Sequence, residues 1–517
     1  MEYSFTTGNF NAGPVKCMTS TTADVKRMAA AAEMRQEEHL RYLELFAVAF
    51  DELHGAVIEQ IRTPTQYIGP HHDYPVMSLL DSGFPYFSES GFYENNAPRN
   101  YVGTVRPNSL GGLLAGLNHP KMEFPRGAEL ASFLQGHEIG ERLNLSRFVD
   151  DGTVSDWRVD KLVNCAVERY LYLHGLDARV DVNRRDAIIR PLVFGTIWRR
   201  LDLRLIVPIA MTHFEVDHFR LNETSYIARI PKRLQLARAR MSTLGSGAAQ
   251  MVVGAATHAF VSKGWNLDVD NIYEVQKSLN QSSSNILDAT DSFFGALRVA
   301  TGVITGYAQM LWVPRRWALD YFCDLTPVYG TTLRRYPSEF DNYGWVGAGT
   351  TVPIEHLNEV RRIYRAVVSS QSEAMRLALR RLNGCLTRTD AADAILDGTI
   401  GLEILLGDDE NQALSYKLRL RAAALAKLKA DPAYPAVEVS SRIKRLYKAR
   451  SAIVHGRRKP RSKTASEPAD TSNAKDRLAA SDLLRFVINV LLTKPEYQDS
   501  PGKIDDDLLL RGGDVVK

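Results

Sequence analysis

An arginine and a histidine near the end of one predicted helix are the residues of this sequence best suited to do chemistry. They are Arg450 and His455, in the segment YKARSAIVHG (Tyr447–Gly456). Histidine accepts and returns a proton near neutral pH, and the arginine guanidinium binds phosphate oxygens with two parallel N–H groups. The pair therefore suits cleavage of RNA by the neighbouring 2′-hydroxyl. His455 would move the proton, and Arg450 would stabilise the charge that grows on the phosphorane oxygens.

The helix that carries this pair decides where each side chain points. Its inward stripe is formed by apolar residues at Ile443, Leu446, Ile453 and Val454. Arg450 lies about 20° from this stripe, so its guanidinium needs a carboxylate, backbone carbonyls or a bound anion. His455 lies about 140° further around the helix. The two side chains therefore converge only if the last turn is distorted near Gly456, or if a second subunit supplies the partner residues.

Positive charge is concentrated around the pair. Residues 411–463 contain 15 Lys and Arg against two acidic residues, although the whole chain has a net charge of only +4. This asymmetry favours a polyanionic partner, with nucleic acid first, and the alternative is a solvated basic helix face. Directly after His455 the basic residues are Arg457, Arg458, Lys459, Arg461 and Lys463. We expect them to hold the RNA backbone beside the site, and the alternative is a solvated loop.

The C-terminal part of the chain has a helical period throughout. The helical segments are 354–384 (one helix or two), 390–407, 411–430, 437–456 and 474–493. Asp390 is a suitable N-cap for the second segment, and Gly407 is a suitable stop. Because most connections between these segments are short, the pattern predicts a helical bundle.

The preceding residues predict a mixture of helices and strands. Helical patterns cover 24–62 and 158–175, loops with short strands are expected over 63–125, and strand patterns cover 203–211, 214–221 and 226–230. The predicted class is therefore α+β, with a mixed α/β N-terminal region before an all-α C-terminal bundle. The expected division is a disordered 1–22, a helical and loop region 23–150, a mixed α/β sensor or regulatory domain 151–350, the bundle 351–497 and a tail 498–517.

The segment RSAIVHG resembles the R-x-x-x-x-H motif of HEPN domains (higher eukaryotes and prokaryotes nucleotide-binding), and the region is most similar to the Apea-like HEPN group. Three blocks carry this resemblance: DAILDGTIGLEILLG with an inward Glu403, YKLRLRAAAL with Arg421, and IKRLYKARSAIVHG. It covers about Ile354–Leu492. Loosely similar blocks occur in IVPIAMTHFEVDHFRL and SFFGALRVATGVITG, which look like parts of the region that often precedes this domain.

The resemblance implies a dimeric, metal-independent endoribonuclease with one composite cleft formed by two copies of the Arg450 and His455 helix. It also implies a toxin-like role in anti-phage abortive infection, with host or viral RNA, often tRNA, as substrate. An N-terminal region would sense an unknown trigger. Glu403 and Arg421 would orient the catalytic residues or compensate buried charge. Tyr447 would pack against its neighbours or stack on a base. Because HEPN domains also serve as scaffolds, the alternatives are a non-catalytic RNA- or nucleotide-binding module and a dimerisation scaffold.

Other features argue against several classes of protein. The four cysteines form no C-x-x-C pair, which fits a reducing compartment and argues against a structural zinc site. No signal peptide and no apolar run of about 18 residues is present, so we expect a cytoplasmic protein without membrane contact. The His71, His72 and Asp73 cluster lacks a matching ligand set, and His137 and Glu138 lack the second histidine of a metalloprotease. We therefore expect neither a metal nor a cofactor.

Overall fold

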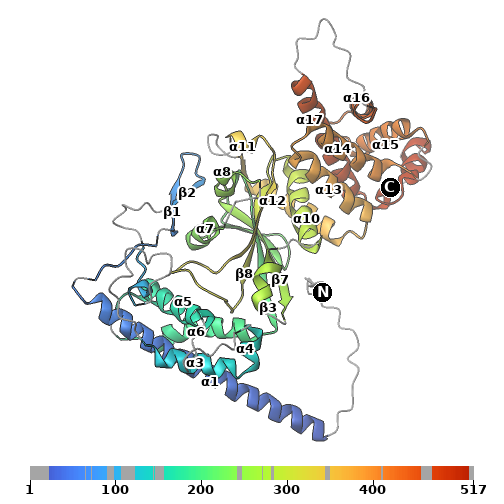
Figure 1. Cartoon of the computed structure of the whole chain (residues 1–517). Helices are drawn as coiled ribbons and strands as arrows, with labels where there is room; N and C mark the ends of the chain where they lie inside the picture. The colour runs from blue at the N-terminus through green and yellow to red at the C-terminus, as the bar shows by residue number, and fades with distance from the viewer. Residues whose placement is uncertain are drawn as a thin grey trace.

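The chain folds into N-terminal helices, a central sheet and C-terminal helices that follow one another along the sequence (Figure 1). The computed structural model describes residues 22–64, 66–71, 73–89, 98–105, 123–143, 145, 157–177, 179–241, 247–269, 272–280, 284–343, 350–408, 412–455 and 469–511. The class is α+β with a C-terminal helical region, as predicted. In the described part of the chain, every helix is too short or too polar to cross a lipid bilayer.

The N-terminal helices pack around the long helix α1. They are α1 (Thr22–Ile61), α3 (Pro125–Gln135), α4 (Glu138–Arg142), α5 (Trp157–His174) and α6 (Val182–Ile197), with the 3₁₀ turn η1 (Val102–Thr104). Phe46, Phe50 and Leu53 recur at three- and four-residue steps and are buried in a core of their own. The predicted helices over 24–62 and 158–175 are confirmed. Gly175 has φ +87° just after α5, which is the left-handed conformation that ends many helices.

The central sheet is antiparallel and has the strand order β5-β6-β7-β3-β8-β9. Its strands are β3 (Arg200–Pro208), β5 (His218–Arg220), β6 (Ser225–Arg229), β7 (His258–Asp268), β8 (Tyr307–Pro314) and β9 (Tyr329–Arg335). Two small pairs lie outside it: antiparallel β1 (Pro75–Leu79) with β2 (Pro85–Glu89), and parallel β4 (Thr212–Phe214) with β10 (Thr350–Val352). The associated helices are α7 (Lys232–Ala239), α8 (Gln250–Gly254), η2 (Ile272–Glu274), α9 (Val275–Leu279), α10 (Ser284–Thr301) and α11 (Phe340–Tyr343).

The strand predicted over 214–221 is wrong as a single element, whereas those at 203–211 and 226–230 match β3 and β6. The chain bends at 215–217, so β4 pairs with β10 and β5 pairs with β6 in a different sheet. The Glu215 carboxylate at the bend accepts a hydrogen bond from the Ile354 N–H at 2.9 Å. The bend therefore caps the first C-terminal helix, a role that alternation of apolar residues does not reveal.

The C-terminal helices match the predicted pattern. They are α12 (Ile354–Ser369), α13 (Glu373–Thr387), α14 (Ala391–Leu406), α15 (Leu414–Lys429), α16 (Ala436–Val454) and α17 (Ala469–Thr493), followed by η3 (Pro495–Tyr497), α18 (Pro501–Lys503) and the π-helical η4 (Ile504–Leu510). Asp390 caps α14 by accepting the Asp393 N–H at 2.9 Å, and the helix ends at Gly407, as predicted. A Cβ at Gly398 would lie 2.7 Å from the Ala480 Cβ, so this glycine allows α14 to approach α17 closely.

One hydrophobic core joins the sheet to the C-terminal helices. It contains Phe260 and Trp312 from the sheet together with Leu405, Leu446 and Val487 from the bundle. Helix α10 packs against α12, α13 and α17, and Figure 1 shows it between the sheet and the bundle. The sheet and the bundle thus share their buried apolar surface, while the N-terminal helices are built mainly on a separate core.

Acidification is expected to destabilise the sheet through His258. Its side chain is fully buried, its Nδ1 lies 2.9 Å from the Thr257 hydroxyl, and burial lowers its pKa to about 4. The unfolded chain takes up this proton near pH 6.5, so stability falls between pH 6.5 and 4, by at most about 3 kcal/mol. Urea unfolding at pH 7 and pH 5 should show a weaker pH dependence in His258→Gln than in the wild type. The exposed His218→Gln should match the wild type, and an unchanged dependence in His258→Gln would contradict the assignment.

Candidate functional site

Helices α14 and α16 pack together and bring Arg450 against Glu403. Arg450 Nε lies 3.1 Å from Glu403 Oε1, and Nη2 donates to Oε2 at 3.5 Å. The side chains are 28% and 18% exposed, so the pair is partly buried. Because Glu403 lies in the last turn of α14, where a carboxylate is disfavoured by the helix dipole, the arginine supplies the compensating charge. The sequence predicted an inward guanidinium that requires an anion, and Glu403 is that anion.

Tyr447 completes one side of this pair. The Arg450 guanidinium carbon lies 5.2 Å from the centre of the Tyr447 ring, within the range of a cation–π contact. Burial, and then the Glu403 carboxylate, raise the pKa of the Tyr447 hydroxyl above its ordinary value. The packing role expected for Tyr447 agrees with these contacts. The Tyr447 ring and the Glu403 carboxylate together orient the Arg450 guanidinium.

Arg421 lies in a different set of contacts. Its side chain is 3% exposed, and it binds Asp505 at 2.5 Å and Asp408 at 2.9 Å. Its Nη1 donates to the Leu406 carbonyl at 2.7 Å, which satisfies one of the free carbonyls at the end of α14. The Asp505 carboxylate raises the pKa of Arg421 above its ordinary value. Arg421 therefore holds the C-terminal end of α14, and Glu403 with it, without contacting the Arg450 pair.

His455 follows the last residue of α16 and is exposed. Its backbone N–H donates to the Ser451 carbonyl at 3.1 Å, so the last turn keeps the ordinary helical hydrogen bond. The angular separation of about 140° from Arg450 therefore applies. Among the described residues, no hydrogen bond or ion pair joins the His455 side chain to Arg450 or Glu403.

An exposed basic face of α16 ends at His455. Lys444 and Lys448 are exposed and lie about 20° to either side of the His455 direction around the helix. In the part of the chain that the structure describes, neither lysine forms an ion pair with a carboxylate. The sequence analysis counted these lysines in the positive charge of the region but did not identify them individually. Their spacings of 11 and 7 residues from His455 place them on its side of the helix, and this could have been read from the sequence. The residues predicted to extend the RNA contact, Arg457, Arg458, Lys459, Arg461 and Lys463, lie outside the described residues, as does Gly456.

The other polar clusters have structural partners. His71 Nε2 lies 3.1 Å from Glu168 Oε1, and the Glu168 carboxylate also accepts the N–H groups of Tyr101 and Val102. His137 caps α4 by accepting the Ile139 N–H at 3.2 Å. The described residues contain no group of three or more His, Cys, Asp or Glu side chains arranged to hold a metal ion.

Comparison of the chain with protein-family models, with curated proteins and with solved structures found no match. Any functional assignment therefore depends on the chemistry and placement of the residues themselves.

Proposed function

We propose that this chain is an endoribonuclease of the HEPN type that cleaves RNA without a metal ion at a site formed by Arg450 and His455 of two subunits. The observation that carries the proposal is the placement of both residues at one end of α16. Glu403 holds the Arg450 fork at the boundary with α14, and His455 ends the exposed face that carries Lys444 and Lys448. A cationic face leading to a histidine is suited to a phosphodiester backbone.

In the proposed reaction His455 removes the proton from a ribose 2′-hydroxyl, and the 2′-oxygen forms a bond to the adjacent phosphorus. The bond from phosphorus to the 5′-oxygen breaks, and that oxygen takes up a proton from the imidazolium. The products are a 2′,3′-cyclic phosphate and a 5′-hydroxyl. Arg450 donates hydrogen bonds to the nonbridging oxygens, whose negative charge increases in the transition state.

The geometry of α16 supports a site shared by two subunits. Within one regular helix Arg450 and His455 point about 140° apart, so a single copy does not direct both at one phosphate. Two copies related by a twofold axis would bring Arg450 of one subunit opposite His455 of the other. The cellular role proposed with this activity is cytoplasmic, toxin-like anti-phage defence by abortive infection, with tRNA or another host or viral RNA as substrate.

Incubation of the purified chain with total tRNA and rRNA in the presence of EDTA tests the activity. The expected result is cleavage that leaves 2′,3′-cyclic phosphate ends and is lost in His455→Ala. His218→Ala is the matched control, because His218 is also exposed but lies on β5. Cleavage that survives in His455→Ala, or that needs a metal ion, would contradict the proposal.

The second candidate function is RNA binding without cleavage. The observation in its favour is that Glu403 already neutralises Arg450, as structural ion pairs do. RNA retention by the wild type and by His455→Ala, with cleavage by neither, would support this alternative. Charge reversal of Lys444 and Lys448 should weaken the retention of RNA whether the bundle cleaves RNA or only binds it. If the bundle is only a dimerisation scaffold, this change should have no effect on RNA retention.

A further inference from the structure

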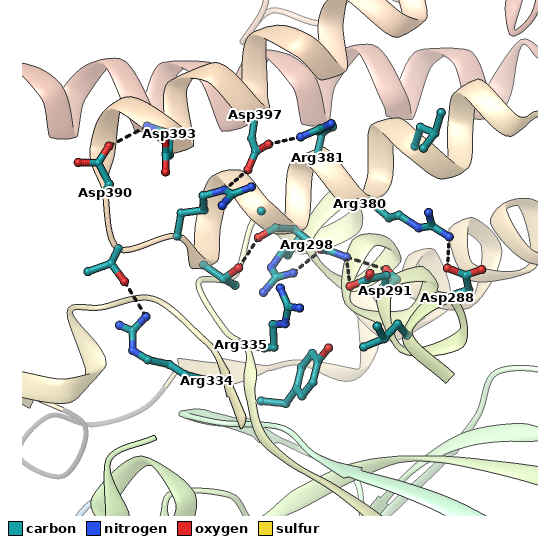
Figure 2. Close-up of a pocket in the computed structure, with 18 residues that line it drawn as sticks. Asp288, Asp291, Arg298, Arg334, Arg335, Arg380, Arg381, Asp390, Asp393 and Asp397 are labelled. Atoms are coloured by element: carbon teal, nitrogen blue, oxygen red, sulfur yellow. Dashed lines mark hydrogen bonds and ion pairs between the residues drawn. The ribbon is translucent and has the colours of Figure 1, made fainter. Parts of the chain in front are cut away.

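A cavity of about 730 Å³ lies where the central sheet meets the C-terminal helices (Figure 2). Residues from α10, β8, β9, α13 and α14 line it, and the residues of the Arg450 site are not among them. Its arginines are Arg298, Arg334, Arg335, Arg380, Arg381 and Arg388. The cavity has the size of a small-molecule site, and side chains from elements distant in the sequence converge on it.

Two of its aspartates are already neutralised. Arg381 and Arg388 bind the two oxygens of Asp397 at 2.6 and 2.5 Å, and Asp397 is 5% exposed. Arg380 forms an ion pair with Asp288. These contacts build the wall of the cavity and compensate the charge of Asp288 and Asp397. Asp291, Asp390 and Asp393 also line the cavity, so its six arginines stand against five aspartates.

Arg298 is buried with part of its guanidinium unsatisfied. Its side chain donates to the Asn383 amide oxygen and to the Thr305 carbonyl at 2.6 Å. Its Nε has no hydrogen-bond partner among the described residues, although the residue is only 2% exposed. Burial lowers its pKa to about 10 and raises the pKa of the neighbouring Asp291. An unsatisfied donor on a buried cation is costly, and the positive charge of Arg298 favours an anion in the cavity that this residue lines.

Arg335 adds a second cation to the cavity lining. Its backbone pairs with Tyr307 between β9 and β8, and its side chain is exposed. Figure 2 shows this side chain extending from β9 toward Arg298. In the described part of the chain, Arg335 forms no side-chain hydrogen bond or ion pair. Arg334, beside it, is held by Asp341 and Thr389 at about 3 Å.

We propose that this cavity binds a small phosphorylated ligand, with its phosphate on Arg335 and Arg298. Planar guanidinium groups with free N–H donors are the preferred protein partners of phosphate oxygens. Asp393 also lines the cavity, at the beginning of α14, with an exposed carboxylate. A carboxylate accepts hydrogen bonds from hydroxyl or amino groups, so the ligand carries such donors beside its phosphate. This inference is independent of RNA cleavage.

Calorimetric titration of the full chain with pyrophosphate and with ADP tests the site. We expect saturable binding of both probes, with ADP the tighter. Arg335→Gln is expected to weaken both by about tenfold or more, because a charged hydrogen bond is lost. Since Arg335 is exposed and unpaired, this variant should keep its melting temperature. Arg376→Gln is the matched control, since Arg376 is an exposed arginine of α13 that does not line the cavity.

Asp393→Asn tests the contact to hydroxyl or amino groups separately from the contact to the phosphate. It is expected to weaken ADP binding while leaving pyrophosphate binding unchanged or stronger, because it removes a negative charge and a hydrogen-bond acceptor. Absence of saturable binding of both probes would overturn the proposal. Binding that is unaffected by Arg335→Gln, or equally weakened by Arg376→Gln, would also overturn it.

Discussion

Mixing the Arg450→Ala protein with the His455→Ala protein is expected to restore RNA cleavage that neither variant performs alone. By symmetry the cleft of a dimer holds two Arg450–His455 pairs, each with one residue from either subunit. In a mixed dimer one pair loses both residues, whereas the other pair keeps Arg450 from one subunit and His455 from the other. Random exchange of subunits makes half of the dimers mixed, so about a quarter of the wild-type activity should return. If each subunit contained a complete site of its own, mixing would restore nothing. The measurement is the rate of appearance of 2′,3′-cyclic phosphate ends after subunit exchange.

Each single variant should be severely impaired before mixing. Removing one hydrogen-bond donor to a developing oxyanion lowers the rate by about 10²- to 10³-fold. Arg450→Ala removes a guanidinium that can donate two such hydrogen bonds. The fold should survive, because the Arg450–Glu403 ion pair is partly exposed and contributes on the order of 1 kcal/mol. Arg445→Ala is the control, since Arg445 is an exposed arginine on the same helix. Full activity of Arg450→Ala would show that this arginine only neutralises Glu403.

Replacement of Arg421 by alanine is expected to lower stability by about 2–3 kcal/mol, and the Tm by about 3–5 °C. Removing one partner from a fully buried ion pair costs about 3–5 kcal/mol, but Asp505 is 37% exposed and water will partly solvate it. The Leu406 carbonyl also loses its donor. Thermal unfolding followed by circular dichroism measures the effect.

The control for Arg421 is Lys427→Ala, which removes an exposed positive charge near the end of the same helix and should leave the Tm unchanged. RNA cleavage by Arg421→Ala well below its Tm should persist, because Arg421 does not contact the Arg450 pair. A normal Tm combined with lost cleavage would show that Arg421 takes part in the chemistry directly.

Local patterns in the sequence predicted much of the C-terminal region. The Asp390 cap and the Gly407 stop are encoded within one turn of the residues that they affect, and the inward position of Arg450 follows from helical spacing alone. The partner of Arg421 could not be predicted in this way. Asp505 lies 84 residues further along the chain, and no periodic pattern connects the two.

The same limit applies to the sheet and to the arginine-lined cavity. Alternation of apolar residues from Phe214 to Leu221 predicted one strand, but the contact of Glu215 with the start of α12 divides it. The arginines of the cavity come from β9, α10, and α13 and the residue after it. Their convergence is a property of the tertiary structure, because each of them is individually an ordinary charged residue on its own element.

The core that the sheet and the bundle share has a practical consequence for dissecting this protein. A fragment that begins at Pro353 would leave behind Phe260 and Trp312, and it would present the faces of α12 and α13 that normally pack on α10 directly to water. Such a fragment should aggregate or stay partly unfolded. An assay of the isolated bundle would then report the loss of its apolar support and not the chemistry of Arg450 and His455. Full-length single-residue variants are therefore the better reagents for testing the proposed activity.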